Sequence, residues 1–73
     1  MTPNLATALR ELGFSSVTNG RWYDRGTVRV RETDGTIFVQ VFAGKIGTTL
    51  AFSMQFTDAP DAVVIAAVGA VVS

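Results

Sequence analysis

Two alternating runs of apolar and polar residues flank an Asp-Gly pair near the middle of the chain, and this arrangement constrains the fold more than any other feature. The runs are residues 27–32 and 37–42, and the pair occupies positions 34–35. Asp-Gly favours the two-residue turn of a β-hairpin. Such a turn sets Val30 opposite Val39 and therefore decides which side chains share a face of the sheet.

The following loop extends this hairpin to a third strand. If residues 44–47 form a four-residue loop, Ala43 lies opposite Thr48 and Val39 lies opposite Phe52. The registers of the two hairpins, assigned separately, place apolar side chains on one common face. These side chains belong to Val28, Val30, Ile37, Val39, Val41, Leu50, Phe52, Met54 and Phe56. We therefore predict an antiparallel meander in which this face is buried.

Helices are expected at both ends of the chain. Thr2 fits the N-cap of the first helix, Pro3 its first position, and Gly13 its end. Asp58 fits the N-cap of the second helix, which then continues to about Val72. The order of elements predicts a single α+β domain over residues 1–73, with two layers in the order α-β-β-β-α. Its meander has three to four strands, and both helices lie on one face of the sheet.

An Asn-Gly pair at residues 19–20 is a further turn signal. It sets Val17 across from Trp22, and the alternation of a strand then sends Trp22 and Tyr23 to opposite faces. Because Trp22 lies opposite Val17, we expect Trp22 to face the core and Tyr23 to be half exposed.

Gly26 interrupts the strand that follows. A glycine inside a strand pattern indicates either a β-bulge or a break between two short strands. Of these we expect the bulge, within one long bent strand over residues 21–32.

The overall charge and hydrophobicity favour self-association over binding to nucleic acid. Six basic and six acidic residues give a net charge of zero, whereas duplex-DNA binders carry a basic excess that neutralises phosphates. Hydrophobic residues make up 48% of the chain and charged residues only 16%. So small a domain does not easily bury that much apolar surface, so we expect a homo-oligomer.

No combination of residues indicates catalysis. The chain has no histidine and no cysteine, so it lacks the commonest general base and the commonest soft metal ligands. Asp24, Glu32 and Asp34 lie in one stretch, but Asp34 occupies the turn and the other two have arginine neighbours. We predict that the protein is not an enzyme and has no cofactor and no metal site.

Two surfaces are candidate partner-binding sites. The face of the sheet opposite the predicted core carries an arginine and aromatic set, and the outward side of the second helix has no charge, which is unusual for a helix exposed to water. The open alternatives for the sheet face are a protein interface, a solvated surface and a platform for single-stranded nucleic acid. The candidate residues are Arg29, Arg31, Phe38, Gln40 and Phe42 on the sheet, and Ala62, Ala66 and Gly69 on the helix.

Residues 52–67 combine a final strand, a proline and an alanine-rich helix, and they resemble the end of small actinobacterial and actinobacteriophage proteins. Residues 21–23 (Arg-Trp-Tyr) and 28–31 (Val-Arg-Val-Arg) are similar to the first strands of those proteins. These proteins have no settled activity, so no functional residue is carried over. The resemblance implies a setting among phage or prophage accessory genes, which often encode small host-interacting proteins.

These observations together predict a small, non-enzymatic interaction protein, homo-oligomeric and phage-encoded, that binds a host or phage protein. The alternatives are a single-stranded nucleic-acid-binding module and a minor structural component of a virion. The N-terminus does not resemble a signal peptide, and residues 62–72 are shorter than the roughly 20 that span a bilayer. We therefore expect a soluble protein of the bacterial cytoplasm.

Overall fold

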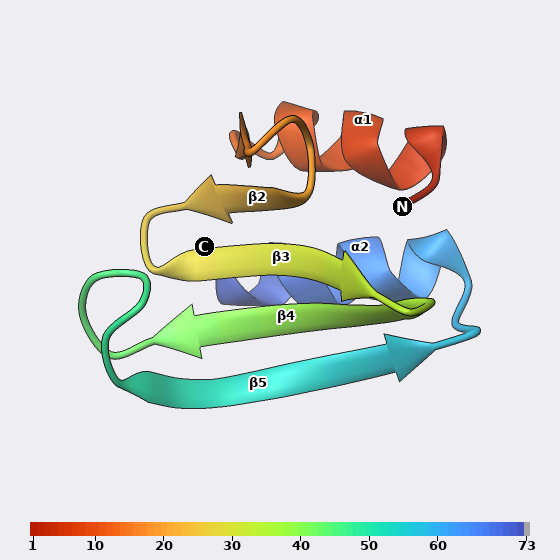
Figure 1. The fold of residues 1–73 in the computed structure, drawn as a ribbon. Helices are drawn as coiled ribbons and strands as arrows, with labels where there is room; N and C mark the ends of the chain where they lie inside the picture. The colour runs from red at the N-terminus through yellow and green to blue at the C-terminus, as the bar shows by residue number, and fades with distance from the viewer. Residues whose placement is uncertain (73) are drawn as a thin grey trace.

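The computed structural model describes residues 1–72 and has an α+β architecture (Figure 1). An N-terminal helix, a meander of five antiparallel strands and a C-terminal helix follow one another, and the strand order in the sheet is the order in the chain. The elements are α1 (Pro3–Glu11), β1 (Ser15–Val17), β2 (Trp22–Arg25), β3 (Val28–Thr33), β4 (Thr36–Phe42), β5 (Leu50–Thr57) and α2 (Asp61–Val71). The predicted meander is confirmed, but the sheet has five strands rather than three to four.

Helix α1 begins and ends as the sequence predicts. The Thr2 hydroxyl accepts a hydrogen bond from the Leu5 N–H at 3.2 Å. At the other end Gly13 adopts a φ of 90°, and the Phe14 N–H donates to the Leu9 carbonyl at 3.0 Å. The bond from Phe14 and the left-handed Gly13 belong to a Schellman motif, in which glycine is favoured because it adopts a left-handed conformation without strain. The motif directs the chain from α1 into β1.

The central hairpin, between β3 and β4, has the predicted register. Asp34 and Gly35 both have positive φ, at 51° and 80°, as a type I′ turn requires. Val30 consequently pairs with Val39, and both side chains are fully buried.

The register between β4 and β5 differs from the prediction by two residues. Val39 pairs with Met54 rather than with Phe52, and the pairing shifts again late in β4. The predicted register assumed a tight loop, whereas the Ala43 N–H donates to the Thr49 carbonyl at 2.8 Å and the connection is longer. A shift of two residues leaves the side chains from Phe52 onward on their predicted face, because strand side chains alternate with a period of two. The second shift sets Leu50 opposite Phe42 rather than Val41.

Gly26 forms a turn, so the predicted bulge is wrong. Arg25 pairs with Val28, which leaves Gly26 and Thr27 as a two-residue connection between β2 and β3. Gly26 has a φ of 57°, a left-handed conformation that reverses the chain rather than bending one continuous strand. This hairpin, together with the short β1, accounts for the extra strands.

The same hairpin reverses the predicted roles of the two adjacent aromatic rings. Val17 pairs with Trp22 as predicted, but Tyr23 pairs with Val30, whose side chain lies in the core. Tyr23 is therefore buried, with 4% exposed, and Trp22 lies half-buried on the opposite face beside Arg31. Pairing with β3, rather than with the short β1, decides which ring faces the core.

Helix α2 begins three residues later than Asp58, so the predicted N-cap is wrong. Asp58 has a φ of 58°, whereas an N-cap residue needs an extended conformation. Pro60 has that conformation and is the N-cap, although it has no side-chain hydrogen bond to offer. Asp61 lies in the first turn, where its charge suits the helix dipole, and accepts a hydrogen bond from the Thr2 hydroxyl at 2.5 Å. This bond links the starts of the two helices.

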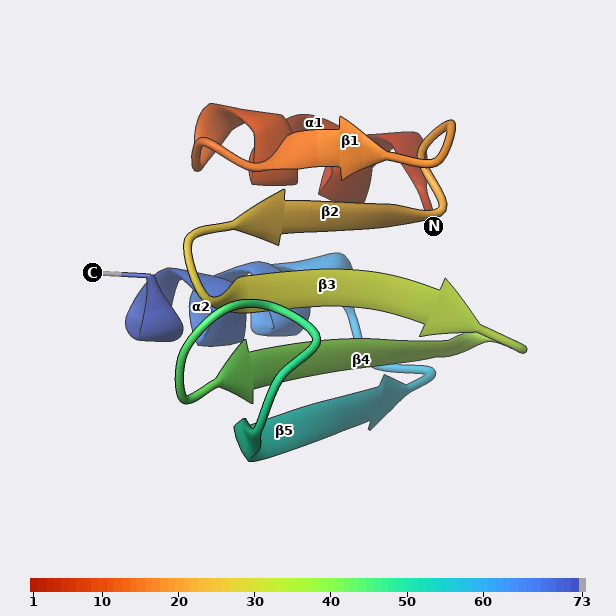
Figure 2. The same cartoon turned by 60° about the vertical axis from the view of Figure 1, so that its left-hand side comes forward.

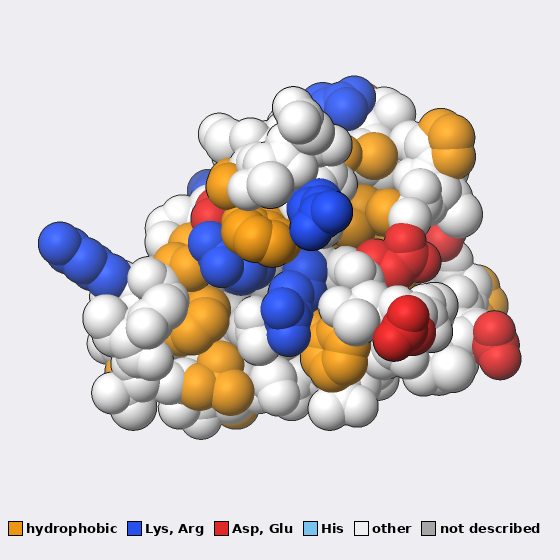
Figure 3. All heavy atoms as spheres, in the orientation of Figure 1, with side chains coloured by type: hydrophobic (Ala, Val, Ile, Leu, Met, Phe, Trp, Pro, Cys, Tyr) orange, Lys and Arg blue, Asp and Glu red, His pale blue; other side chains and the backbone are white. Residues whose placement is uncertain are grey.

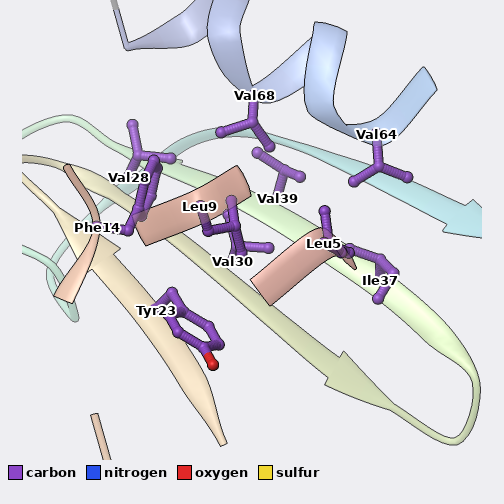
Figure 4. Close-up of a cluster of buried hydrophobic side chains, with 10 residues drawn as sticks. All are labelled: Leu5, Leu9, Phe14, Tyr23, Val28, Val30, Ile37, Val39, Val64 and Val68. Atoms are coloured by element: carbon purple, nitrogen blue, oxygen red, sulfur yellow. The ribbon is translucent and has the colours of Figure 1, made fainter. Parts of the chain in front are cut away.

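The core lies between the helices and one face of the sheet (Figure 4). Both helices bury residues in the same cluster as the inward side chains of β2, β3 and β4, and the helices contact each other. Figures 1 and 2 place α1 over the β1–β2 end of the sheet. The buried residues are Leu5, Leu9, Phe14, Tyr23, Val28, Val30, Ile37, Val39, Val64 and Val68.

Candidate interaction surfaces

The outer face of the sheet brings four of the five predicted sheet residues into two neighbouring rows. In one row Trp22, Arg31 and Phe38 lie side by side on β2, β3 and β4, and in the next row Arg29 pairs with Gln40. All are half-buried. Figure 3 shows Lys and Arg side chains gathered among hydrophobic side chains in the middle of this face. The fifth predicted residue, Phe42, is also half-buried, at the end of β4 opposite Leu50.

Arg29 is satisfied within the chain. Its Nε donates to Asp24 Oδ1 at 2.8 Å and its Nη2 donates to Asp24 Oδ2 at 2.9 Å. The guanidinium also lies over the Trp22 ring, 4.7 Å from the ring centroid. The hydrogen bonds that Arg29 donates to Asp24 raise the pKa of Arg29 above its ordinary value. A guanidinium held by a carboxylate and a ring is not free to neutralise a phosphate.

Arg31 has no such carboxylate partner among residues 1–72. Its guanidinium lies over the Phe38 ring, 5.5 Å from the centroid. Its Nε is buried without a hydrogen-bond partner within the same residues. The two arginines of the predicted site therefore differ: Arg29 belongs to an internal ion pair, and Arg31 retains unused donors.

The outward side of α2 is exposed and uncharged, as predicted. Ala62 and Ala66 are exposed and Gly69 is half-buried. Val63, which the sequence did not single out, is 48% exposed. After Asp61 the helix carries no charged residue, so water meets an apolar surface along its length.

The sequence missed β5 as a candidate surface. Leu50 and Phe52 were expected to be buried, and they are 44% and 48% exposed. For Phe52 the prediction fails because the inward face of five strands is wider than helices of nine and eleven residues cover. For Leu50 it fails because the register shift sets that residue opposite Phe42 rather than Val41. Since β5 pairs only with β4, its other side is a free edge. The uncharged composition of residues 50–57 was the signal available in the sequence.

Among residues 1–72, no group of three or more His, Cys, Asp or Glu side chains is placed to hold a metal ion. Neither α1 nor α2 is long enough to cross a bilayer, and the described part of the chain contains no other helix.

Comparisons with known proteins do not assign the chain to a family. No protein-family model matches the sequence, and the searches of curated proteins and of solved structures give no significant match. The function must therefore be inferred from the surfaces themselves.

Proposed function

We propose that the chain is a non-enzymatic interaction protein that acts as a homodimer, formed by pairing of β5 with β5 of a second copy. The observation that carries this proposal is the free β5 edge, eight residues long, with Phe52 nearly half exposed on its inward face and Leu50 exposed at its start. A long edge strand without charge or proline is the kind that pairs with another chain. Burial of the remaining apolar surface of a Leu or Phe would add about 1 kcal/mol for each side chain.

The distribution of side chains on β5 selects one way of pairing. When two identical strands pair antiparallel around a two-fold axis perpendicular to the sheet, residues directly opposite each other must point to the same face. This condition is met only if the axis passes midway between one residue and the same residue of the copy. An axis through Ser53 sets Phe52 opposite Met54 of the copy, and an axis through Met54 sets it opposite Phe56. Either axis joins the two sheets into one, with apolar side chains facing apolar side chains and all helices on the same side.

Helix α2 does not cover β5, because it lies behind β3 and β4 (Figures 1 and 2). In the joined sheet the two α2 helices would therefore lie on either side of the paired β5 strands. Their exposed side chains are small and uncharged, including Val63, Ala66 and Ala70. After Asp61 no charged side chain of either helix opposes the approach of the second copy to the apolar side of β5.

The outer face of the sheet supports the other candidate partners less well. Arg29 is held by Asp24, and the chain has no basic excess, so the alternative of single-stranded nucleic acid rests mainly on Arg31 and its aromatic neighbour. The setting among phage genes and a host protein as further partner stay predictions, supported by the resemblance of residues 21–23, 28–31 and 52–67 alone.

Light scattering of a matched pair of variants tests the proposal. Phe52→Lys places a charge on the β5 edge, and Ser15→Lys places the same charge on an exposed position of β1. The wild type and Ser15→Lys should have twice the 7.8 kDa mass of one chain. Phe52→Lys should weaken association at least tenfold, or about 1.4 kcal/mol, with unchanged circular dichroism. A monomeric wild type at millimolar concentration, or a Phe52→Lys variant that remains dimeric, contradicts it.

A further inference from the structure

A hollow of about 470 Å³ lies at the edge of the outer face, where the turn before β2 approaches the end of β3. Its volume is within the range of small-molecule sites. Trp22 and Arg31, which are cross-strand neighbours, form part of its wall. The lining residues are Met1, Gly20, Arg21, Trp22, Arg31, Glu32, Thr33 and Asp34.

Two buried hydrogen-bond donors belong to residues that line this hollow. Trp22 Nε1 and Arg31 Nε have no partner among residues 1–72. Buried donors in folded proteins are nearly always paired, and an unpaired one calls for a ligand, a water or an ion. Both nitrogens are shielded from solvent by surrounding protein atoms, so in this conformation neither is open to a molecule in the hollow.

The charges around the hollow favour an anion. Arg21 is exposed and, like Arg31, forms no ion pair within the described residues. Two carboxylates also line the hollow. Glu32 pairs with the Met1 amine, and Asp34 is exposed in the β3–β4 turn. Two guanidinium groups without an ion-pair partner in the described residues therefore outnumber the one unpaired carboxylate.

We propose that this hollow binds the phosphate group of a small phosphorylated ligand. Arg21 and Arg31 supply guanidinium forks, which match phosphate oxygens. The hollow is larger than a phosphate ion, so the organic part of the ligand fits beside the Trp22 ring. The site lies on β2 and β3, away from the β5 edge, so it stands or fails independently of the dimer.

The single tryptophan of the chain makes the test direct. Its indole N–H gives one resolved nitrogen–proton NMR signal, which we would follow during titration with inorganic phosphate and with phenyl phosphate. Sodium chloride at matched ionic strength is the control for screening. The indole signal should shift and saturate with both phosphates but not with chloride, and phenyl phosphate should bind more tightly.

Two variants that each remove one arginine charge separate a built site from general attraction. Arg31→Gln should weaken phosphate binding at least tenfold, whereas Arg10→Gln, at an exposed position on α1, should leave it unchanged. A shift that does not saturate, or an equal affinity in the two variants, overturns the proposal. Light scattering of the same samples reports the dimer separately, so loss of one property does not imply loss of the other.

Discussion

The two edges of the sheet differ in length, polarity and covering. β1 has three residues, Ser15 and Ser16 are exposed, and α1 lies beside it (Figure 2). β5 has eight residues, no charge and no proline, and its Phe52 is 48% exposed. Short polar edges resist pairing with another chain, whereas long uncharged edges favour it. One edge is therefore protected within the monomer, and the other is suited to a partner.

The difference follows from how few residues are available to cover the sheet. Each helix buries two side chains almost completely, with at most 1% of each exposed: Leu5 and Leu9 of α1, and Val64 and Val68 of α2. Inward residues of β5, such as Phe52, remain exposed because the described chain has no further element to cover them. A second copy would supply that cover with the same residues, which is an economical solution for a domain of 73 residues.

The largest expected contrast is in the free energy of unfolding lost when Leu9 of α1 and Leu50 of β5 are each replaced by alanine. Leu9→Ala removes a side chain with no exposed surface, so it should lower the free energy of unfolding by about 2–5 kcal/mol. Leu50→Ala should cost less than about 1 kcal/mol, because that side chain is half exposed. Urea unfolding in a Phe52→Lys background measures both without a contribution from association. Equal costs would mean that the two sides are packed alike.

Replacing Gly13 and Gly69 by alanine should change the stability of the fold in opposite directions. Gly13 has a φ of 90° next to β1, so Gly13→Ala should destabilise the fold by about 1–2 kcal/mol. Gly69 lies within α2 with open space where a Cβ would be, so Gly69→Ala should stabilise it by about 0.5–1 kcal/mol. Thermal unfolding of both variants in the Phe52→Lys background checks the signs. Destabilisation by Gly69→Ala would contradict the open space around Gly69 on which this prediction depends.

Association through β5 should make stability depend on protein concentration. Each tenfold rise in concentration favours a dimer by about 1.4 kcal/mol, so the Tm of the wild type should rise. The Tm of Phe52→Lys should not change, and that of Ser15→Lys should follow the wild type. Differential scanning calorimetry over a hundredfold range of concentration measures this. A Tm independent of concentration in all three contradicts the dimer.

The smallest expected effect concerns the ion pair on the outer face. Asp24→Asn removes the charge that holds Arg29, and a partly exposed pair of this kind contributes about 0.2–1 kcal/mol. The raised pKa of Arg29 adds stability that is fully present below its ordinary value and is lost only as pH rises through the folded value. From about pH 5 to 9 this guanidinium stays charged in both states. Urea unfolding should therefore give the same loss for Asp24→Asn at both limits, and a loss that varies strongly with pH would contradict this assignment.

Local signals in the sequence predicted the elements that depend on one turn or one cap. Gly13 at the end of α1 and the Asp-Gly turn of the central hairpin lie where expected, because each requires a particular backbone conformation that few residues adopt. The predicted outer face likewise follows from alternation, which fixes Arg31 beside Phe38.

Features that depend on distant contacts could not be predicted in this way. Tyr23 rather than Trp22 faces the core because β2 pairs with β3, and nothing local to the two rings decides it. The exposure of Phe52 depends on how far the helices extend over the sheet, which alternation does not report. The Asp24–Arg29 pair joins two strands across the Gly26 turn. It could not be predicted from one continuous strand with a bulge at Gly26, because such a strand does not bring the two residues opposite each other.

The most direct test of the central claim is a cross-link between the two β5 strands. The chain has no cysteine, so a single introduced thiol reports only contact between copies. Residues on a two-fold axis between paired strands lie close enough for a disulfide. Ser53→Cys or Met54→Cys should oxidise rapidly to a linked dimer, identified on a non-reducing gel, while Ser16→Cys on β1 should remain monomeric. Equal rates at all three positions would contradict pairing through β5.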